Sequence, residues 1–380
     1  MNFTLSEEQK MLTKLVHDFA VNEIEPIASK IDEDSLFPIQ IINKAAKLGL
    51  MGVGYPEEYG GSGGKSIEQL IVFEEIARAC AATSVILIVT NELAGYPLFS
   101  FGNTQQKQKF LVPLLKGEKI GAFALTEAGA GSDVASLRCT AVKKGSGYII
   151  NGNKTFISNG AEAEIIITFA TLDKSQGYRG ITSFIIEKGM PGFSVGKRER
   201  KMGIHGSSTT ELIFDNVFIP EENRLGEEGK GFPIALASID TSRLGIAAQA
   251  NGISQAAFER ALSYAKERHQ FGQPISQFQA IQWMLANMAT RIDAAKLLTF
   301  RAAYLKDTAQ TFIKEASMAK LYAAETSVYV TNKALQIYGG YGYIKDHPLE
   351  RYYRDAKITE IYEGTSEMQR WTIARQLLKD

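Results

Sequence analysis

The apolar residues in the first third of the chain recur at helical spacing. Ser6 and Gln9 have the spacing of a capping box, which marks the start of a helix. The apolar residues that follow fall on one face of that helix, namely Met11, Leu12, Leu15, Val16 and Phe19. A long apolar run at 67–89 follows the glycine-rich loop at 56–64 and is typical of a buried helix. We therefore expect residues 1 to about 120 to form an N-terminal helical domain.

From about Gly121 the hydrophobic period shortens, and runs rich in β-branched and aromatic residues alternate with turn signals. The expected strands lie at 138–142, 147–150, 165–171, 181–187, 193–197, 210–214 and 217–219. Because these short strands have no helices between them, they predict a small antiparallel barrel or sandwich. We expect this middle β domain to span residues 121–230.

Helical periodicity returns at Phe232 and persists to the end of the chain. One apolar stripe consists of Phe278, Ile281, Met284, Leu285, Met288 and Ile292, and a second stripe covers 312–337. These stripes predict a helical bundle over residues 231–380, whose faces pack together or against a second subunit. The fold class expected from the three zones is α+β, mostly α.

Charge balance and cysteine usage exclude several classes of protein. The 380 residues include 42 Lys and Arg and 42 Asp and Glu, so bulk positive charge does not favour a nucleic-acid partner. Cys80 and Cys139 are far apart and have no neighbouring cysteine, which excludes a disulfide framework and a thiolate zinc site. The four histidines are scattered without metal-ligand spacing, so we expect no metal site.

Targeting signals are weak as well. The opening residues have neither a basic start nor an apolar segment behind it, so we expect no signal peptide. The longest apolar run, at 85–89, is far shorter than the roughly 20 residues that span a bilayer. These features predict a cytoplasmic protein that does not enter a membrane.

Common nucleotide-binding and hydrolase motifs do not account for the chain. Gly129-Ala130-Gly131 lacks the third glycine and the βαβ context of a dinucleotide fingerprint, and no Walker loop occurs. The segment 60–64 has the letters of a nucleophile elbow, but no strand precedes it. We therefore interpret that match as chance.

Three other segments are candidates for chemistry. The loop 125–133 is rich in small residues, hydroxyls and backbone N–H groups that could approach a flat ligand closely, or it is an ordinary polar turn. The segment 151–160 could form one wall of a planar ring site, or it is a plain hairpin strand. Near the end, Thr365 is a plausible N-cap of the last helix, and Glu363 lies in the loop before it. A lone loop glutamate is most often simply solvated.

Taken together, these segments resemble the acyl-CoA dehydrogenase family over nearly the whole chain. The matching motifs lie at 123–133, 151–160, 268–272, 336–343, 351–355 and 361–367. The family fold has an N-terminal helical domain, a middle β-barrel-like domain and a C-terminal helical bundle. The resemblance implies the removal of a proton from Cα of an acyl thioester and of a hydride from Cβ to FAD, which yields a trans-2-enoyl-CoA. Glu363 matches the family's catalytic base, with its own backbone N–H and a flavin hydroxyl stabilising the thioester oxygen.

The resemblance also assigns binding residues. FAD contacts would come from Leu125, Thr126, Ser132, Phe156, Ile157, Ser158, Arg268, Phe271, Gln279, Gln336, Ile337, Tyr338, Gly339, Gly340, Thr365, Ser366 and Glu367. Of these, Arg268, Phe271, Gln279 and 336–340 match groups that reach the FAD of a neighbouring subunit, so a homo-oligomer, by family habit a tetramer, is implied. Acyl-CoA contacts would come from Ser132, Asp240, Thr241, Ser242, Arg243 and Gly364.

The subfamily and the direction of the reaction are the remaining questions. The segments 204–209 and 240–247 resemble short-chain, butyryl-CoA-type members. Ser242 stands where some relatives carry the base, and Ser84 where dicarboxylic-acyl relatives carry an arginine. Tyr96 replaces an expected glycine beside the acyl pocket, next to Glu92. The implied electron acceptor is an electron-transfer flavoprotein. The alternatives are an enoyl-CoA reductase fed by such a flavoprotein and, against the intact Glu363-Gly364 pair, a catalytically silent acyl-CoA-binding scaffold.

Overall fold

The N-terminal part of the chain is helical, as expected. The computed structural model describes residues 4–379, and the Ser6 capping box at the start of α1 is confirmed. The helical elements are α1 (Glu7–Phe19), η1 (Ala20–Ile24), η2 (Glu25–Ile27), α2 (Ala28–Glu33), α3 (Ile39–Lys47), η3 (Glu57–Tyr59), α4 (Ser66–Ala79), α5 (Ala81–Ile88), η4 (Val89–Gly95), α6 (Tyr96–Phe101), α7 (Thr104–Gln106), η5 (Lys107–Leu111) and α8 (Val112–Leu115). The apolar run at 67–89 is two helices, because Cys80 adopts extended dihedral angles (φ −154°, ψ 107°) between them.

The middle part of the chain forms one mixed sheet with the strand order β6-β7-β3-β2-β4-β5-β8, and β1 pairs with β4. Its elements are β1 (Gly121–Ala124), η6 (Val134–Ser136), β2 (Thr140–Lys144), β3 (Gly147–Ser158), β4 (Ile165–Thr171), η7 (Lys174–Gly180), β5 (Ile181–Glu187), β6 (Phe193–Arg198), β7 (Thr209–Pro220), η8 (Glu221–Asn223) and β8 (Arg224–Leu225).

Two expectations for this sheet were wrong in detail. The sheet is not purely antiparallel, because β1 and β2 both pair with β4 in parallel. The strands expected at 210–214 and 217–219 are one strand, and β3 continues through the turn signal at 151–153. Both strands stay paired because β-bulges, one of them between Ile150 and Gly152, absorb the extra residues.

The C-terminal part of the chain is a bundle of long helices, as expected. Its elements are α9 (Gly231–Glu267), β9 (His269–Gln270), β10 (Gln273–Pro274), η9 (Ile275–Gln277), α10 (Gln279–Asp307), α11 (Ile313–Tyr338), α12 (Gly340–Tyr343), α13 (Leu349–Ile358) and α14 (Ser366–Leu377). The helix α9, most of whose residues are buried, packs against α4, α10 and α11. The close approach to α4 requires Gly252, since a Cβ there would lie 2.2 Å from the backbone oxygen of Glu74.

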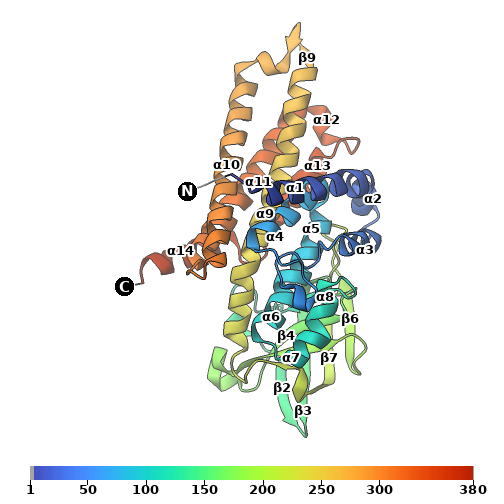
Figure 1. The fold of residues 1–380 in the computed structure, drawn as a ribbon, viewed down its shortest axis with the longest axis vertical. Coiled ribbons are helices and arrows are strands. Elements are labelled where there is room, and N and C mark those ends of the chain that lie inside the picture. Colours follow the sequence, from blue (N-terminus) through green and yellow to red (C-terminus); the bar gives the residue numbers. More distant parts are fainter. Residues whose placement is uncertain (1–3, 380) are drawn as a thin grey trace.

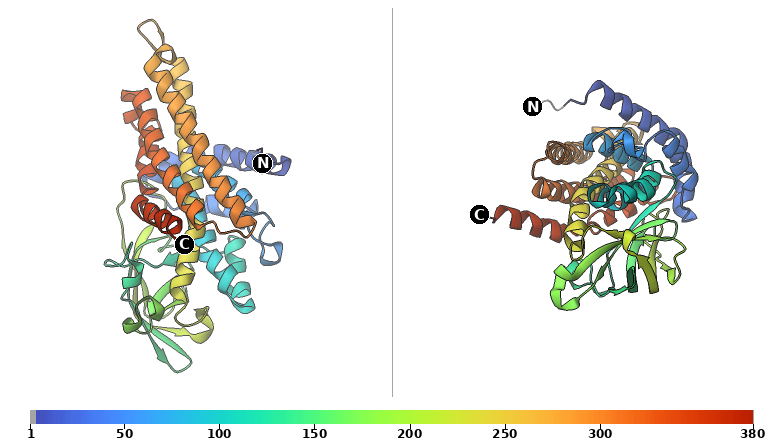
Figure 2. Two further views of the ribbon diagram at one scale, coloured as in Figure 1. Left: turned by 90° about the vertical axis from the view of Figure 1, so that its left-hand side faces the viewer. Right: turned by 60° about the horizontal axis from the view of Figure 1, so that its bottom comes forward.

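The helix α9 connects the two ends of the molecule. Figure 1 shows the sheet and the helices α6 to α8 around one end of α9, and the β9 hairpin at its other end. In both views of Figure 2 the sheet lies to one side of the helices, and the right-hand view shows α14 projecting outward near the C-terminus. The expected α+β, mostly α, architecture is confirmed.

One helical stretch is longer and more apolar than the sequence suggested. Ala81–Phe101 runs through α5, η4 and α6 for 21 residues and is long and apolar enough to cross a membrane. However, 78% of its most apolar window is buried inside the protein, which is the behaviour of a core helix. The uninterrupted apolar run ends at Val89 only because Thr90, Asn91 and Glu92 follow, and all three are themselves buried.

Candidate active site

Glu363 lies in the short loop between α13 and α14 and is held in an unusual conformation. Its φ is +53°, which a non-glycine residue rarely adopts, and the φ of Gly364 is +89°. The Ser242 hydroxyl on α9 donates a hydrogen bond of 2.7 Å to Glu363 Oε2. Thr365 caps α14 by accepting from the backbone N–H of Met368, as the sequence predicted. The loop therefore presents the carboxylate to Ser242, in the first half of α9, in a backbone conformation of the kind that clusters at functional sites.

The side chains of Gln369 and Lys320 hold the backbone of this loop through hydrogen bonds. Gln369 Nε2 donates to the carbonyl oxygens of Glu363 (3.0 Å) and Gly364 (2.9 Å). The fully buried Lys320 on α11 donates to the Gly364 carbonyl at 2.7 Å. Burial lowers the pKa of Lys320 to about 7, although the nearby Glu363 opposes that shift. Lys320 therefore places a titrating cation beside the candidate base.

Burial also controls the proton affinity of Glu363. Desolvation raises the pKa of its carboxyl above the ordinary value, against the Ser242 hydrogen bond and the positive charges of Lys320 and Arg243. A carboxylate with a raised pKa is better suited to accept a weakly acidic proton near neutral pH. The site thus has the local chemistry of a general base.

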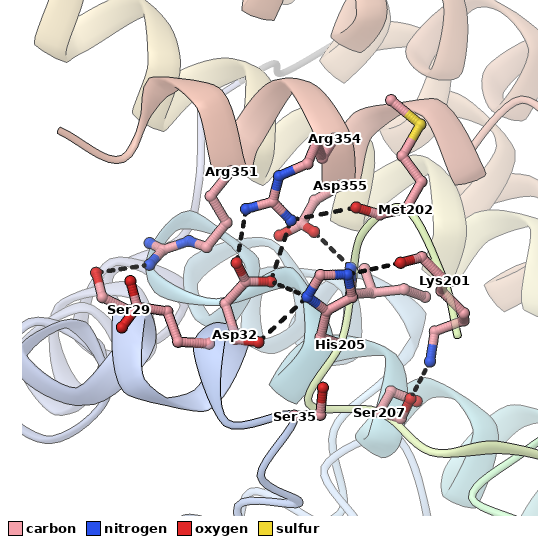
Figure 3. Close-up of polar contacts among 12 residues, drawn as sticks. Ser29, Asp32, Ser35, Lys201, Met202, His205, Ser207, Arg351, Arg354 and Asp355 are labelled. Atoms are coloured by element: carbon pink, nitrogen blue, oxygen red, sulfur yellow. Dashed lines mark hydrogen bonds and ion pairs between the residues drawn. The ribbon is translucent and has the colours of Figure 1, made fainter. Parts of the chain in front are cut away.

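A charged cluster anchors the helix that leads into the loop (Figure 3). Arg354 on α13 donates to Asp32 on α2, with 2.6 Å between Nη2 and Oδ2, and also to Glu350. Asp32 is in turn 3.0 Å from His205 Nδ1, and Asp355 accepts from the backbone N–H of Ile204 at 2.5 Å. These contacts connect three parts of the chain: α2, the loop before β7, and α13. The helix α13 ends five residues before Glu363. The contacts hold the start of the loop that carries Glu363 against two other parts of the fold.

The two segments expected beside a planar ring lie next to each other. The backbone N–H of Thr155 donates to the Thr126 carbonyl at 2.9 Å. Beneath them Lys154, which is fully buried, bonds to Glu127 Oε1 (2.8 Å) and to the Leu125 carbonyl (3.1 Å). Glu127 also accepts from the backbone N–H groups of Arg138 and Cys139 and so closes the loop on itself.

The surface formed by these segments is partly open. Phe156 is 64% exposed with a φ of +57°, and Ser132 is exposed, whereas Leu125 and Ile157 are buried. Thr126 and Ser158 are half-buried. The buried Thr155 Oγ1 has no hydrogen-bond partner within residues 4–379. An exposed aromatic ring, open hydroxyls and an unpartnered polar atom are features of a surface that receives a polar, planar ligand.

The residues expected to contact acyl-CoA on α9 surround the Glu363 contact. Arg243 pairs with Asp240 at 2.6 Å and also donates to Ser317. Burial lowers the pKa of Arg243 and raises the pKa of Asp240. Thr241 is buried, and its hydroxyl has no partner in the described part of the chain. The Ser242 hydroxyl is already hydrogen-bonded to Glu363 and does not point into an open acyl-CoA site.

A second set of expected residues lies at the other end of α9. A groove of about 500 Å³ near the β9 hairpin is lined by Tyr264, Arg268, Gln270, Ile275, Ile337, Tyr338, Gly339, Gly340, Tyr341 and Ile344. Phe271 is 93% exposed beside it, and Gln279 and Gln336 are exposed. Within one chain this set is far from the sheet that carries Phe156 (Figure 1). The structure therefore does not unite all the expected cofactor residues in one site of one chain.

Several residues of the site were missed by reasoning from the sequence. The pairing of Ser242 with Glu363 spans 121 residues, and Lys154 and Lys320 have no motif of their own that marks them as buried. Within residues 4–379, no group of three or more His, Cys, Asp and Glu side chains is arranged to hold a metal ion.

Family comparisons identify the class of protein that this fold and site define. Three family models match consecutive parts of the chain: the acyl-CoA dehydrogenase N-terminal domain over residues 6–118, the middle domain over 122–217 and the C-terminal domain over 229–378. The chain belongs to the acyl-CoA dehydrogenase family, and it is an oxidoreductase that acts on acyl-CoA.

Close relatives include short-chain enzymes. The short-chain specific acyl-CoA dehydrogenase of Clostridium acetobutylicum is 48% identical, with both chains covered completely. The acryloyl-CoA reductase (NADH) of Anaerotignum propionicum is also 48% identical over 100% of this chain and 96% of its own. Butyryl-CoA dehydrogenase from Megasphaera elsdenii superimposes with a TM-score of 0.98 at 45% identity, with both chains fully covered. A chain from a structure described as the electron transferring flavoprotein of Acidaminococcus fermentans has a TM-score of 0.99 at 46% identity, again over both full lengths.

Proposed function

We propose that this protein catalyses the α,β-dehydrogenation of a short-chain acyl-CoA to a trans-2-enoyl-CoA. The observation that carries the proposal is the Glu363 carboxylate, held by Ser242 in a loop whose burial raises its pKa. Similarity to a butyryl-CoA dehydrogenase and to a short-chain specific relative supports the chain length.

The proposed cofactor is FAD, and the residues present fit it. The exposed ring of Phe156, the hydroxyls of Thr126 and Ser158 and the unpartnered Thr155 Oγ1 would face the flavin. Thr365, Ser366 and Glu367 at the start of α14 are the remaining expected contacts, and the Ser366 hydroxyl is also buried without a partner within residues 4–379. When bound, a flavin supplies the acceptor for the hydride that leaves Cβ.

The chain's own residues handle the proton. Glu363 accepts the proton from Cα, and the Ser242 hydrogen bond orients its carboxylate along α9. The backbone N–H of Glu363 donates to the thioester oxygen, where negative charge develops. Gln369 binds the carbonyls of Glu363 and Gly364, and Lys320 binds the Gly364 carbonyl, so the loop backbone that carries this N–H is held in place. The acyl group that covers the loop excludes water and raises the proton affinity of the base further.

The reverse reaction is the second candidate function. A relative at 48% identity is named as an acryloyl-CoA reductase, and another structural match comes from work on an electron-transfer flavoprotein. In that direction the protonated Glu363 would return its proton to Cα. We propose an electron-transfer flavoprotein as the redox partner in either direction.

A panel of acyl-CoA thioesters tests the function and the chain length together. The purified protein should be yellow, and butyryl-CoA should bleach its flavin without oxygen much faster than octanoyl-CoA does. The physical reason is that each methylene kept out of an apolar pocket forfeits about 0.8 kcal/mol of transfer energy. A faster reaction with octanoyl-CoA would contradict the short-chain assignment. A protein that binds acyl-CoA but is never bleached by it, and whose reduced form no enoyl-CoA reoxidises, would be the silent scaffold.

The assembly is proposed to be a homo-oligomer in which Arg268 contacts the cofactor of a neighbouring subunit. In support, both tryptophans of the chain, Trp283 on α10 and Trp371 on α14, are more than half exposed, which is unusual for a free surface. The Arg268 groove lies far from the Phe156 surface of the same chain (Figure 1).

Arg268→Ala should weaken both FAD retention and the oligomer, because ligand binding and assembly are linked. Gel filtration with light scattering, run with and without added FAD, measures both effects. Lys266→Ala, also exposed at the end of α9, is the matched control and should leave both unchanged. A wild-type protein that is an FAD-saturated monomer would contradict the assignment.

A further inference from the structure

A second carboxyl group, on Glu92, faces the same stretch of α9 as the catalytic base. Glu92 lies in the π-helical turn η4, and such turns are common at functional sites. It is 1% exposed, and its Oε2 approaches the backbone of Gly245, where a Cβ would lie only 2.3 Å away. Any side chain at position 245 would displace this carboxyl group. Glycine thus leaves room for Glu92 on that face of α9.

The position of Gly245 places Glu92 beside the catalytic loop. Ser242, Gly245 and Gln249 share one face of α9, because residues three and four apart are neighbours on a helix. Ser242 donates to Glu363, and Gln249 accepts from the Tyr362 hydroxyl. Glu92 therefore meets α9 between the contacts of two consecutive loop residues. Gly245, against which Glu92 packs, lies about 4.5 Å along the helix axis from Ser242, at 1.5 Å per residue.

Glu92 is incompletely satisfied inside the protein. Its Oε2 has no hydrogen-bond partner of good geometry within residues 4–379, although it lies against the backbone of Gly245, which lowers the pKa of the carboxyl. Buried carboxyl oxygens are normally paired, so an unpaired one beside a substrate site points to a ligand that completes it. Tyr96, four residues further along the chain at the start of α6, behaves differently. Its ring packs against Phe101, and Lys306 Nζ lies 5.8 Å from the ring centroid, so Tyr96 already has partners within the protein.

The charges around Glu92 select the kind of ligand. Lys306, from the end of α10, and Glu363 are both close enough to shift its pKa in opposite directions, and Tyr55 and Tyr96 lie on the same side. Lys306 repels a cationic substituent and Glu363 repels an anionic one, so the attraction that either ionic group finds here is offset by a repulsion. A neutral hydroxyl meets neither penalty, and it can donate to or accept from a carboxyl group in either protonation state.

We propose that Glu92 is a specificity-determining residue that selects short acyl-CoA thioesters carrying a neutral hydroxyl group beyond Cβ. This proposal rests on the proposed function, because it assigns the acyl chain of that reaction. The chemistry at Cα and Cβ is unchanged: the proton goes to Glu363, the hydride goes to the flavin, and the hydroxyl is retained. Burial, more than any charge, raises the pKa of Glu92 to about 8, so near neutral pH it can donate as well as accept.

Equilibrium binding to the oxidised holoenzyme tests the proposal, because enoyl-CoA thioesters bind there without turnover. Calorimetry compares crotonyl-CoA with trans-4-hydroxybut-2-enoyl-CoA, whose trans double bond prevents lactone formation. The hydroxylated thioester should bind at least about tenfold more tightly, the ratio that one buried hydrogen bond gives. Glutaconyl-CoA, which ends in a carboxylate, and trans-4-aminobut-2-enoyl-CoA should both bind more weakly than the hydroxyl compound. Equal or tighter binding of crotonyl-CoA overturns the proposal.

Two substitutions separate hydrogen bonding from shape. Glu92→Leu, of similar size, should remove the preference and favour crotonyl-CoA. Glu92→Gln should keep the preference, since an amide both donates and accepts. If Glu92→Leu keeps the wild-type ratio, or if Glu92→Gln loses the preference as completely as Glu92→Leu does, Glu92 does not bind the hydroxyl. If no enoyl-CoA binds to the wild-type holoenzyme at all, it is the proposed function that fails.

Discussion

Replacing Glu363 with glutamine should slow flavin reduction by at least about 10²–10⁴-fold, the usual contribution of a general base. The amide keeps the size of the carboxylate and still accepts the Ser242 hydrogen bond, so acyl-CoA binding and FAD content should be retained. Anaerobic stopped-flow absorbance with butyryl-CoA measures the reduction rate. Glu360→Gln is the matched control in the same loop: its carboxylate pairs with Lys357, away from the base, and the variant should react near the wild-type rate.

The pH dependence of flavin reduction should also identify Glu363 as the base. Burial raises the pKa of Glu363, and dehydrogenation requires the deprotonated carboxylate. The reduction rate should therefore increase with pH through a value above the ordinary carboxyl range and then level off. Enoyl-CoA reduction uses the protonated form and should decrease over the same interval. A Glu363→Gln variant that reduces its flavin near the wild-type rate, or a wild-type profile already flat from pH 5, would mean that another group is the base.

Local sequence patterns were sufficient for the architecture but not for its interruptions. The hydrophobic period changes at Gly121 and Phe232, because a strand buries every second residue whereas a helix buries a stripe of residues three and four apart. The structure has its strands and its long C-terminal helices in the regions that this change predicts. The break at Cys80 and the turn η4 lie within a continuous buried stretch, where every position is inside the protein and periodicity carries no information. The bulges of β3 and β7 were likewise hidden, because the turn residues at 151–153 also suit a bulge.

The candidate site was likewise only partly predictable from the sequence. The motif around Glu363 was visible in the sequence, but the residues that tune it come from distant parts of the chain. Ser242 reaches Glu363 from α9, and Lys320 reaches Gly364 from α11. A lysine is usually a surface residue, so nothing in the sequence marks Lys320 or Lys154 as buried. Only the packing of long helices and the pairing of β3 bring these cations inside, where their charge has its largest effect.

The ion pair beneath the loop 125–133 should be among the most stabilising contacts of the middle domain. Lys154 is fully buried, and the Glu127 side chain is only 10% exposed. Lys154→Met removes the counter-charge and leaves a buried carboxylate with two backbone donors. Breaking such a pair from one side costs about 3–5 kcal/mol. We expect a clear loss of stability in urea unfolding and weaker FAD retention, because Leu125 and Thr126 lose their support.

The pH dependence and a double variant distinguish a broken ion pair from a simple loss of packing. Although burial opposes it, Lys154 and the hydrogen bonds around Glu127 hold the pKa of that carboxyl below its ordinary value. The stabilisation is therefore present above the unfolded pKa of about 4.3 and is lost as the pH falls through the folded value, so the difference between wild type and Lys154→Met should shrink in acid. Adding Glu127→Gln to Lys154→Met should restore much of the lost stability, since the amide can be buried without charge. Lys144→Met, at the exposed end of β2, is the control. Equal losses for the two lysine variants, or no recovery in the double variant, would show that the pair does not stabilise the domain.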